Sequence, residues 1–258
     1  MIGAIAGDII GSFYETKSVK TKNFQLFVKT SRFTDDTVLT IAVADCIMNQ
    51  KDYTKTCQAY GRKYPKKKYG SNFFKWIFNE HPEPYNSFGN GSAMRVSSIG
   101  FFYNSIETVL NEAEKSAKIT HNHIEGIKGA QAVAASIFLA NQGKTKNEIK
   151  HFIEEKFTYN LNQTLDSIRE NYTFDMSCQG SVPQSIISFL ESTDYEDAIR
   201  NAISLGGDTD TMACIAGGIA QAYYKKIPQE IITEVKLRLP HEFIEIINQF
   251  DTITNCKY

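Results

Sequence analysis

The chain has 258 residues, of which 42% are hydrophobic and 22% charged, and its formal net charge is −1. This length is enough to bury a large core, and the near-neutral charge excludes a nucleic-acid or membrane-surface binder that works by overall charge. No stretch approaches the roughly 20 apolar residues that a membrane-spanning helix needs. We therefore expect one domain over residues 1–258, a monomer without membrane or nucleic-acid partners.

Cysteine usage and the start of the chain indicate a compartment. The five cysteines are scattered, odd in number and never paired as CxxC, which predicts neither a disulfide framework nor a zinc site. The first ten residues are apolar but lack a basic start and are interrupted by Asp8 and by glycines, unlike a secretory leader. These features favour a reducing environment, so we expect a cytoplasmic protein.

Helical periodicity dominates the chain from its first residues. If residues 2–14 form a helix, Asp8 and Glu15 share one face, and their default interpretation is a surface pair. Residues 23–29 alternate weakly and are the one candidate strand. Further along, apolar residues recur with helical spacing over residues 37–48, 124–141, 146–157, 182–192, 194–205, 211–225, 228–239 and 241–250. The sequence therefore predicts a compact all-α fold.

Two connecting segments stand out by composition. Residues 65–69 (PKKKY) form a basic loop whose simplest interpretation is solvated surface, with a phosphate-steering patch as the alternative. Residues 80–91 are the longest turn-rich stretch, and such loops often carry binding function on a helical scaffold. The glycines and small side chains of residues 87–95 allow backbone N–H groups to face an anion, although a tight turn before a helix explains them equally well.

Two short segments combine carboxylates with threonine hydroxyls directly before apolar helices. They are residues 34–37 (TDDT) and residues 206–211 (GGDTDT). Carboxylates this close raise one another's pKa unless a cation lies among them. Oxygen ligands of this kind suit Mg²⁺, Mn²⁺ or Ca²⁺. Acidic residues also cap helices, but the same chemistry at two helix starts favours a two-metal site if the fold joins the segments.

Two histidines precede the segment 124–141. His121 and His123 lie two residues apart, and neither a cysteine nor a third histidine is near them in sequence, so a zinc site is not favoured. We expect polar residues at a helix start, one of them hydrogen-bonding a ligand.

Four motifs, taken together in chain order, resemble those of the ADP-ribosylglycohydrolases. They are residues 7–15 (GDIIGSFYE), 34–37 (TDDT), 89–95 (GNGSAMR) and 207–211 (GDTDT), with His121 matching a family histidine. The resemblance covers almost the whole chain. It implies an all-α fold with two Mg²⁺ or Mn²⁺ ions in a cleft, and an enzyme that cleaves the C1″ bond between ADP-ribose and an acceptor. The partner would be an ADP-ribosylated protein or a small-molecule ADP-ribose conjugate.

The resemblance also implies roles for individual residues. It places metal ligands at Thr34, Asp35, Asp36, Asp208, Asp210 and Thr211. Glu15 matches an acidic residue that in some members contacts a metal and moves when substrate binds. The loop residues Gly89, Asn90, Gly91 and Ser92 would pack against the diphosphate and distal ribose, with His121 nearby. Ser92 departs from the family pattern, where we expect a small apolar residue.

Cleavage of this bond requires several catalytic tasks, and the sequence does not assign each task to a single residue. Its cleavage passes through an oxocarbenium-like carbon, which requires charge stabilisation and a positioned water. A metal pair can orient ribose hydroxyls and lower the pKa of a bound water. Asp35, Asp36, Asp208 or Asp210 could accept the proton, and Glu15 could assist the leaving group.

The sequence does not identify the acceptor, and it leaves three alternative functions possible. Candidate aromatic residues for the cleft rim are Tyr14, Phe88 and residues 101–103, although such residues are more often core. The alternatives are another two-metal nucleotide hydrolase, a catalytically silent ADP-ribose-binding module, and a structural helical protein whose acidic turns are caps.

Overall fold

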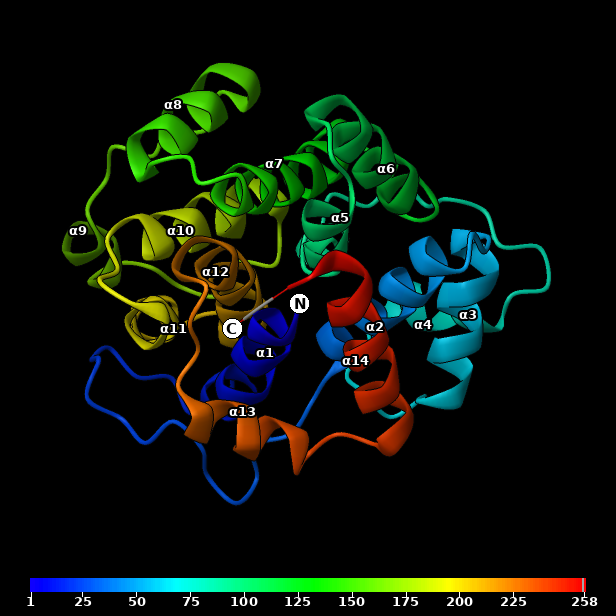
Figure 1. Ribbon diagram of the computed structural model, residues 1–258, viewed down its shortest axis with the longest axis horizontal. Coiled ribbons are helices and arrows are strands. Elements are labelled where there is room, and N and C mark those ends of the chain that lie inside the picture. Colours follow the sequence, from blue (N-terminus) through cyan, green and yellow to red (C-terminus); the bar gives the residue numbers. More distant parts are fainter. Residues whose placement is uncertain (257) are drawn as a thin grey trace.

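The computed structural model describes residues 1–256 and 258, and helices make up its framework (Figure 1). They are α1 (Ile2–Tyr14), α2 (Asp35–Met48), α3 (Tyr53–Lys63), α4 (Ser71–Phe78), η1 (Asn90–Ser92), α5 (Ser97–Phe102), α6 (Ile106–Lys118), α7 (Ile124–Asn141), α8 (Lys146–Phe157), α9 (Leu165–Arg169), α10 (Cys178–Leu190), α11 (Tyr195–Ser204), α12 (Thr209–Tyr224), α13 (Gln229–Lys236) and α14 (His241–Thr254). Within these described residues no strand forms, and the sole β-bridge joins Gly89 to Ser177. The predicted all-α fold is confirmed.

Helices α1 and α12 form the centre of the molecule, with α7, α10 and α11 packed on the other sides of α12 (Figure 1). Glycines spaced four residues apart give α1 a face without side chains. A Cβ atom on Gly7 would lie 2.0 Å from the carbonyl oxygen of Ala213, and one on Gly11 would lie 2.3 Å from that of Thr209. The two backbones can approach this closely only because the glycines are there. Asp8 of α1 is thereby brought next to the start of α12.

Helix α2 begins against α1. The Thr34 hydroxyl caps α2 by accepting a hydrogen bond from the Asp36 amide (3.3 Å). The backbone amides of Thr34 and Thr37 both donate to Asp8 Oδ2, at 2.9 and 3.1 Å. The Asp8 carboxylate therefore lies at the start of α2, where free amides and the helix dipole favour an anion.

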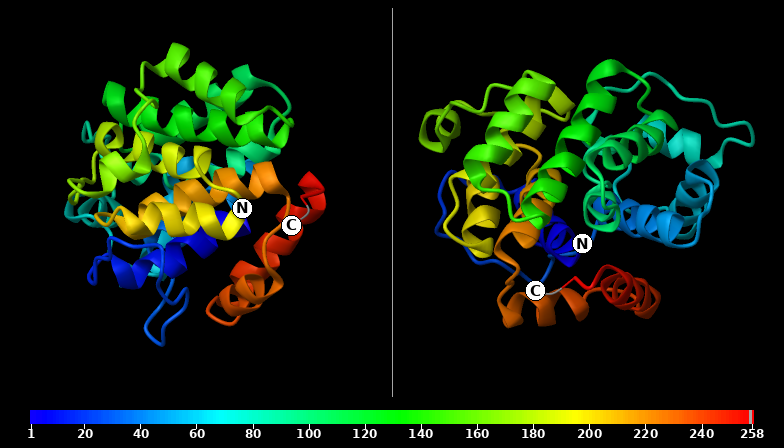
Figure 2. Two further views of the ribbon diagram at one scale, coloured as in Figure 1. Left: turned by 90° about the vertical axis from the view of Figure 1, so that its left-hand side faces the viewer. Right: turned by 45° about the horizontal axis from the view of Figure 1, so that its top comes forward.

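The outer helices cover the body on different sides. Helices α13 and α14 lie together on one side, and α8 lies on the opposite side in each view (Figure 2). None of the described helices is both long enough and apolar enough to cross a bilayer.

The long helices α7, α8 and α10 to α14 were predicted, whereas α3, α4, α5, α6 and α9 were not, and two of the predictions need correction. Residues 124–141 and 146–157 form α7 and α8 as expected. Helix α10 begins at Cys178, ahead of the predicted residue 182, because the Ser177 hydroxyl caps it and Pro183 is tolerated inside it. The candidate strand 23–29 is wrong: it is irregular, and Arg200 donates to the Phe24 carbonyl while Tyr14 donates to that of Gln25.

Candidate active site

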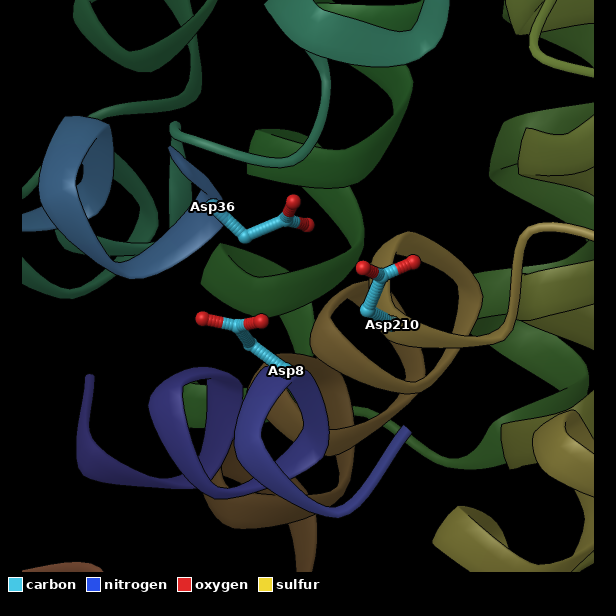
Figure 3. Close-up of side chains that lie close together, drawn as sticks. All are labelled: Asp8, Asp36 and Asp210. Carbon is cyan, nitrogen blue, oxygen red and sulfur yellow. The ribbon is translucent and has the colours of Figure 1, made fainter. Parts of the chain in front are cut away.

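Three aspartates from three helices meet at the junction of α1, α2 and α12. Asp8, Asp36 and Asp210 are 0, 2 and 4% exposed. Each offers a carboxylate oxygen, and these three oxygens lie within 4.8 Å of one another. Figure 3 shows the carboxyl groups facing one another from the separate helices. We call these residues the inner group. Three buried carboxylates at this separation repel one another strongly unless they are protonated or hold a cation.

The inner group is partly satisfied by hydrogen bonds and partly left open. The Thr34 hydroxyl donates to Asp8 Oδ1 (2.6 Å), and the Thr37 hydroxyl donates to Asp8 Oδ2. In contrast, Asp36 Oδ1 is buried and has no hydrogen-bond partner. A buried carboxylate oxygen without a partner is costly, so this oxygen lacks an interaction that a bound cation would supply.

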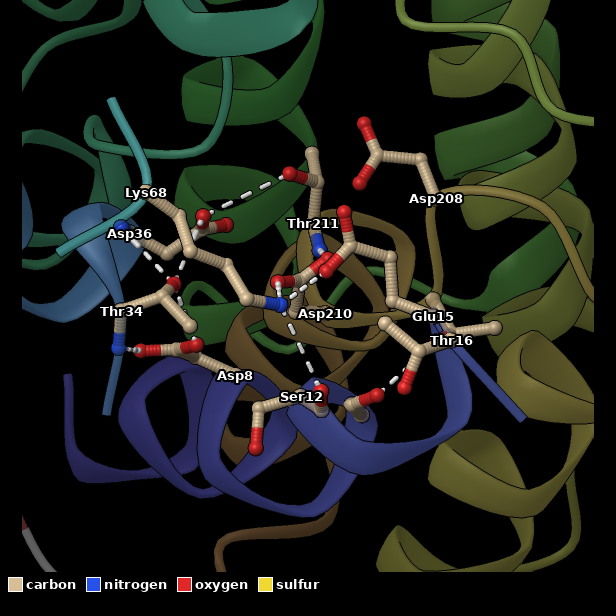
Figure 4. A network of polar contacts seen from close by, with 12 residues as sticks. Asp8, Ser12, Glu15, Thr16, Thr34, Asp36, Lys68, Asp208, Asp210 and Thr211 are labelled. Carbon is tan, nitrogen blue, oxygen red and sulfur yellow. Dashed lines mark hydrogen bonds and ion pairs between the residues drawn. The ribbon is translucent and has the colours of Figure 1, made fainter. Parts of the chain in front are cut away.

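A second group of carboxylates shares Asp210. Glu15, Asp208 and Asp210 also offer oxygens within 4.8 Å of one another, and we call them the outer group (Figure 4). Asp208 occupies the N-cap position of α12, yet its side chain makes no capping hydrogen bond. Its Oδ2 instead accepts from Asn90 Nδ2 (2.8 Å). The interpretation of this acid as a helix cap is therefore wrong.

Two glycines allow the chain to turn Asp208 inward. Gly206 and Gly207 have φ angles of +72° and +76°, a left-handed conformation that favours glycine. A Cβ atom on Gly207 would also lie 2.8 Å from the Tyr172 ring. The paired glycines before the second acidic segment are thus a structural requirement of the site.

The electrostatics of the carboxylates fit divalent cations. Burial raises the pKa of Asp36 and of Asp210 well above the ordinary value, and the Asp8 carboxylate raises that of Asp36 further. Burial and the nearby Asp8 carboxylate likewise raise the pKa of Asp35. A pair of divalent ions would remove this penalty, and an oxygen-only donor set matches hard ions such as Mg²⁺ or Mn²⁺.

All of these carboxylates except Asp8 line a cavity of about 270 Å³. Gly89, Asn90 and Gly91 form part of its wall, and His121 lies beside them. Burial and the nearby Arg95 guanidinium hold the pKa of His121 well below its usual value, so the imidazole is neutral. Its Nδ1 lies 2.7 Å from the Thr120 hydroxyl, which leaves the other ring nitrogen on the side of the glycine loop.

A buried guanidinium gives the cavity a positive element. Arg95 is 0% exposed, forms no ion pair among the described residues, and lines the cavity. Its Nη2 donates to the Ser116 carbonyl and to the Thr120 hydroxyl (3.3 Å), whereas Nη1 has no partner. A buried arginine with an unused donor is suited to an anion such as a phosphate.

The structure brings together most of the residues singled out in the sequence. Those that line the cavity are Glu15, Asp35, Asp36, Gly89, Asn90, Gly91, His121, Asp208, Asp210 and Thr211. Thr34 and Ser92 do not line it. Thr34 instead holds Asp8, and the Ser92 hydroxyl donates to the Gly126 carbonyl (2.7 Å). His123 caps α7 by accepting from the Glu125 amide, as expected of a polar residue at a helix start.

Two sequence interpretations were wrong at this site. Asp8 is not part of a surface pair but is fully buried in the inner group. Lys68 of the basic loop is not simply solvated, because it enters the cavity and pairs with Glu15. The candidate rim aromatics do not line the cavity: Tyr14 and Phe101 belong to the hydrophobic core and Phe102 and Tyr103 pack against it, the interpretation that was favoured for them, while Phe88 is half exposed. The aromatic residues that line the cavity are Phe73, Tyr85 and Phe174. The four-residue spacing of glycines around Asp8 was the signal that could have placed it.

Comparison with known proteins defines the class. The family described as ADP-ribosylglycohydrolase matches residues 1–254. Human and bovine ADP-ribosylhydrolase ARH3 are 28% and 26% identical to the chain, covering 87% and 89% of it and 84% and 85% of their own lengths. A putative ADP-ribosyl glycohydrolase of Acanthamoeba polyphaga mimivirus is 26% identical over 91% of the chain and 89% of its own length.

A solved structure has the same fold. One chain of an ADP-ribosylglycohydrolase-related protein complex superposes with a TM-score of 0.73 at 21% identity, covering 98% of this chain and 95% of that one. This protein belongs to the ADP-ribosylglycohydrolase family. The predicted family is confirmed, and with it the predicted enzyme class, a hydrolase of glycosidic bonds to ADP-ribose.

Proposed function

We propose that this protein hydrolyses the C1″ glycosidic bond between ADP-ribose and an acceptor, either a protein side chain or a small molecule, with two Mg²⁺ or Mn²⁺ ions. The observation that carries the proposal is the position of Asp210, which belongs to both the inner and the outer carboxylate group within one cavity. A carboxylate shared between two such groups is what a pair of neighbouring ions requires.

The ligand set follows from the two groups. Asp36 and Asp210 would hold one ion, and Asp208, Asp210 and Glu15 the other. The Thr211 hydroxyl lies 3.4 Å from Asp36 Oδ2 and lines the same cavity, so it is a further candidate ligand beside Asp35 and Thr34. When bound, the ions orient ribose hydroxyls and lower the pKa of a coordinated water.

The remaining steps belong to side chains of this protein. The unused Arg95 Nη1 and the amides of the glycine loop would bind the diphosphate. The neutral His121 would hydrogen-bond the distal ribose or a phosphate oxygen without adding charge. Asp35, Asp36, Asp208 or Asp210 would take the proton of the attacking water, and Glu15 would assist departure of the acceptor.

Mass spectrometry of reaction products tests the function. The substrates are peptides carrying ADP-ribose on arginine or on serine, and O-acetyl-ADP-ribose, each with Mg²⁺ or with EDTA. Release of intact ADP-ribose that EDTA abolishes is the expected result, and the substrate that reacts identifies the acceptor. Release of AMP or inorganic phosphate would indicate a different two-metal nucleotide hydrolase. Thermal stabilisation by ADP-ribose without release would indicate a binding module.

A variant in the outer group tests whether turnover depends on this site. Asp208→Ala removes one carboxylate of the outer group, and we expect it to abolish turnover while the helical content stays the same. We also propose that the protein acts as a monomer in the cytoplasm, and light scattering of the purified chain measures the first part of this statement.

A further inference from the structure

One lysine enters the outer group from the loop between α3 and α4. Lys68 Nζ forms an ion pair with Glu15 Oε2 and lies 3.7 Å from Asp210 Oδ2. It also donates to the Ser12 carbonyl at 3.5 Å. Figure 4 shows its side chain reaching across the cavity toward these two carboxylates. The ammonium therefore contacts two of the three members of the outer group.

The inner group has no such cation. Among the ion pairs of the described residues, none includes Asp8 or Asp36, the two carboxylates that the inner group does not share. The neighbouring Lys67 forms no ion pair: its ammonium lies 3.3 Å from the centre of the Phe33 ring, and its charge acts on Asp8 only at longer range. The ion pairs of the loop thus include two members of the outer group, one of them the shared Asp210, and neither of the two carboxylates that belong to the inner group alone.

The backbone of the loop is shaped for this contact. Lys68 has a φ of +65°, a left-handed conformation that is unfavourable for a residue with a side chain. An unfavourable backbone conformation persists where the surroundings stabilise it, and here the lysine contacts Glu15, Asp210 and the Ser12 carbonyl.

We infer that the Lys68 ammonium is a tethered cation in the outer group, and that a divalent ion enters this group only by displacing it. This inference rests on the two-ion centre proposed above and deepens it. An ion and the ammonium compete for the same oxygens of Glu15 and Asp210, and they repel each other at this distance. The two ions therefore bind with unequal affinity, the inner one more tightly and the outer one only after Lys68 has moved.

Calorimetric titration of the full-length, metal-free protein with Mn²⁺ tests this order. In Lys68→Met the ammonium is lost and an unbranched side chain remains, so we expect the second Mn²⁺ to bind about tenfold more tightly while the first changes by less than about twofold. Lys68→Arg keeps the charge and should keep the weak second site. Lys67→Met is the matched control, because its ammonium forms no ion pair with a carboxylate of the outer group, and the affinity of the second Mn²⁺ should stay as in the wild type.

The outcomes separate this inference from the proposed function. Lys68→Gly, which also relieves the left-handed backbone, replaces Lys68→Met if circular dichroism shows that the methionine variant has lost helix. If wild type and variant both bind two ions, and the second ion binds with the same affinity in both, the inference is overturned and the two-ion centre stands. One ion in the wild type and two in the variant support it. One ion in both overturns the inference together with the two-ion centre.

Discussion

The inner and outer carboxylate groups share Asp210 and differ in almost everything else. In the inner group, Asp8 is fully buried on a helix and held by Thr34 and Thr37. In the outer group, Glu15 follows the end of α1 and Asp208 precedes α12, and Glu15 is partly exposed and paired with Lys68. Helix packing positions the inner group, whereas two members of the outer group lie at helix ends, one after α1 and one before α12. The two halves of one centre are therefore expected to respond differently to the same perturbation.

The largest effect should come from the shared residue. Asp210→Asn removes a charge from both groups at once while keeping the shape of the side chain. We expect product release to fall about a thousandfold or more, because both ions lose a ligand. In EDTA the same variant should melt no lower than the wild type, since removing one of several crowded carboxylates relieves repulsion. ADP-ribose release and melting temperature are the two measurements, and full turnover in this variant would contradict a shared ligand.

The next largest effect is expected from variants that change one carboxylate group and leave the other intact. Asp36→Asn changes only the inner group and Asp208→Asn only the outer group. We expect Asp36→Asn to weaken the tighter Mn²⁺ about a hundredfold and Asp208→Asn to weaken only the looser one by a similar factor. Calorimetric titration distinguishes the two variants. Identical titration curves would mean that the groups do not act as separate sites.

The close contact of α1 and α12 can be broken without touching any carboxylate. A Cβ atom on Gly7 would overlap the Ala213 carbonyl group, so Gly7→Ala should lower the free energy of unfolding by about 3 kcal/mol. The tighter Mn²⁺ should also bind more weakly, because Asp8 is the next residue. Gly70→Ala is the control for stability, since nothing lies within 4 Å of a Cβ atom there. Denaturant unfolding of both variants measures the difference, and equal losses would exclude close packing as the cause.

The sequence could predict features that depend on neighbouring residues. Local signals mark α7 and α8: His123 caps one, and Thr145 with Glu148 forms a capping box at the start of the other. Both helices were placed correctly from the helical spacing of their apolar residues, and these caps, which also depend on neighbouring residues alone, agree with that placement. The acidic segments were also recognisable, since carboxylates and hydroxyls at two helix starts are unusual for simple caps.

Contacts between distant segments were beyond local reasoning. Asp8 lies amid apolar residues, and its burial depends on the glycine face that α1 presents to α12. The four-residue glycine spacing was visible, but its partner helix was not. The position of the Lys68 side chain depends on the left-handed backbone conformation of Lys68 itself, which no glycine in the sequence signals. It also depends on Glu15 and Asp210, two carboxylates from other segments of the chain. No pattern in residues 65–69 indicates which lysine turns inward.

The pH dependence of stability should report the inner group. Burial and the neighbouring carboxylates raise the pKa of Asp36 in the native state. Between the ordinary aspartate value and this raised value the native protein binds more protons than the unfolded chain, so stability without metal falls as pH rises. Each unit of pKa elevation corresponds to about 1.4 kcal/mol, or about 2–4 °C in melting temperature for a chain of this size.

Melting curves from about pH 5 to about pH 8 test this dependence. In EDTA the melting temperature should decline with rising pH, and the decline should be shallower in Asp210→Asn because one source of repulsion is gone. With saturating Mg²⁺ the trend should reverse, since the ions bind ionised carboxylates and bind more tightly as pH rises. Parallel curves with EDTA and with Mg²⁺ would mean that the carboxylates do not hold the ions.

The smallest effect is expected at Ser92, which belongs to neither group. The Ser92 hydroxyl donates to the Gly126 carbonyl at 2.7 Å and does not line the cavity. Ser92→Ala should therefore lower stability by about 1 kcal/mol, the value of one buried hydrogen bond, and leave both Mn²⁺ affinities unchanged. The KM for an ADP-ribosylated peptide should also stay the same. A raised KM with unchanged stability would place this serine against the ribose after all, and would show that the glycine loop rearranges when substrate binds.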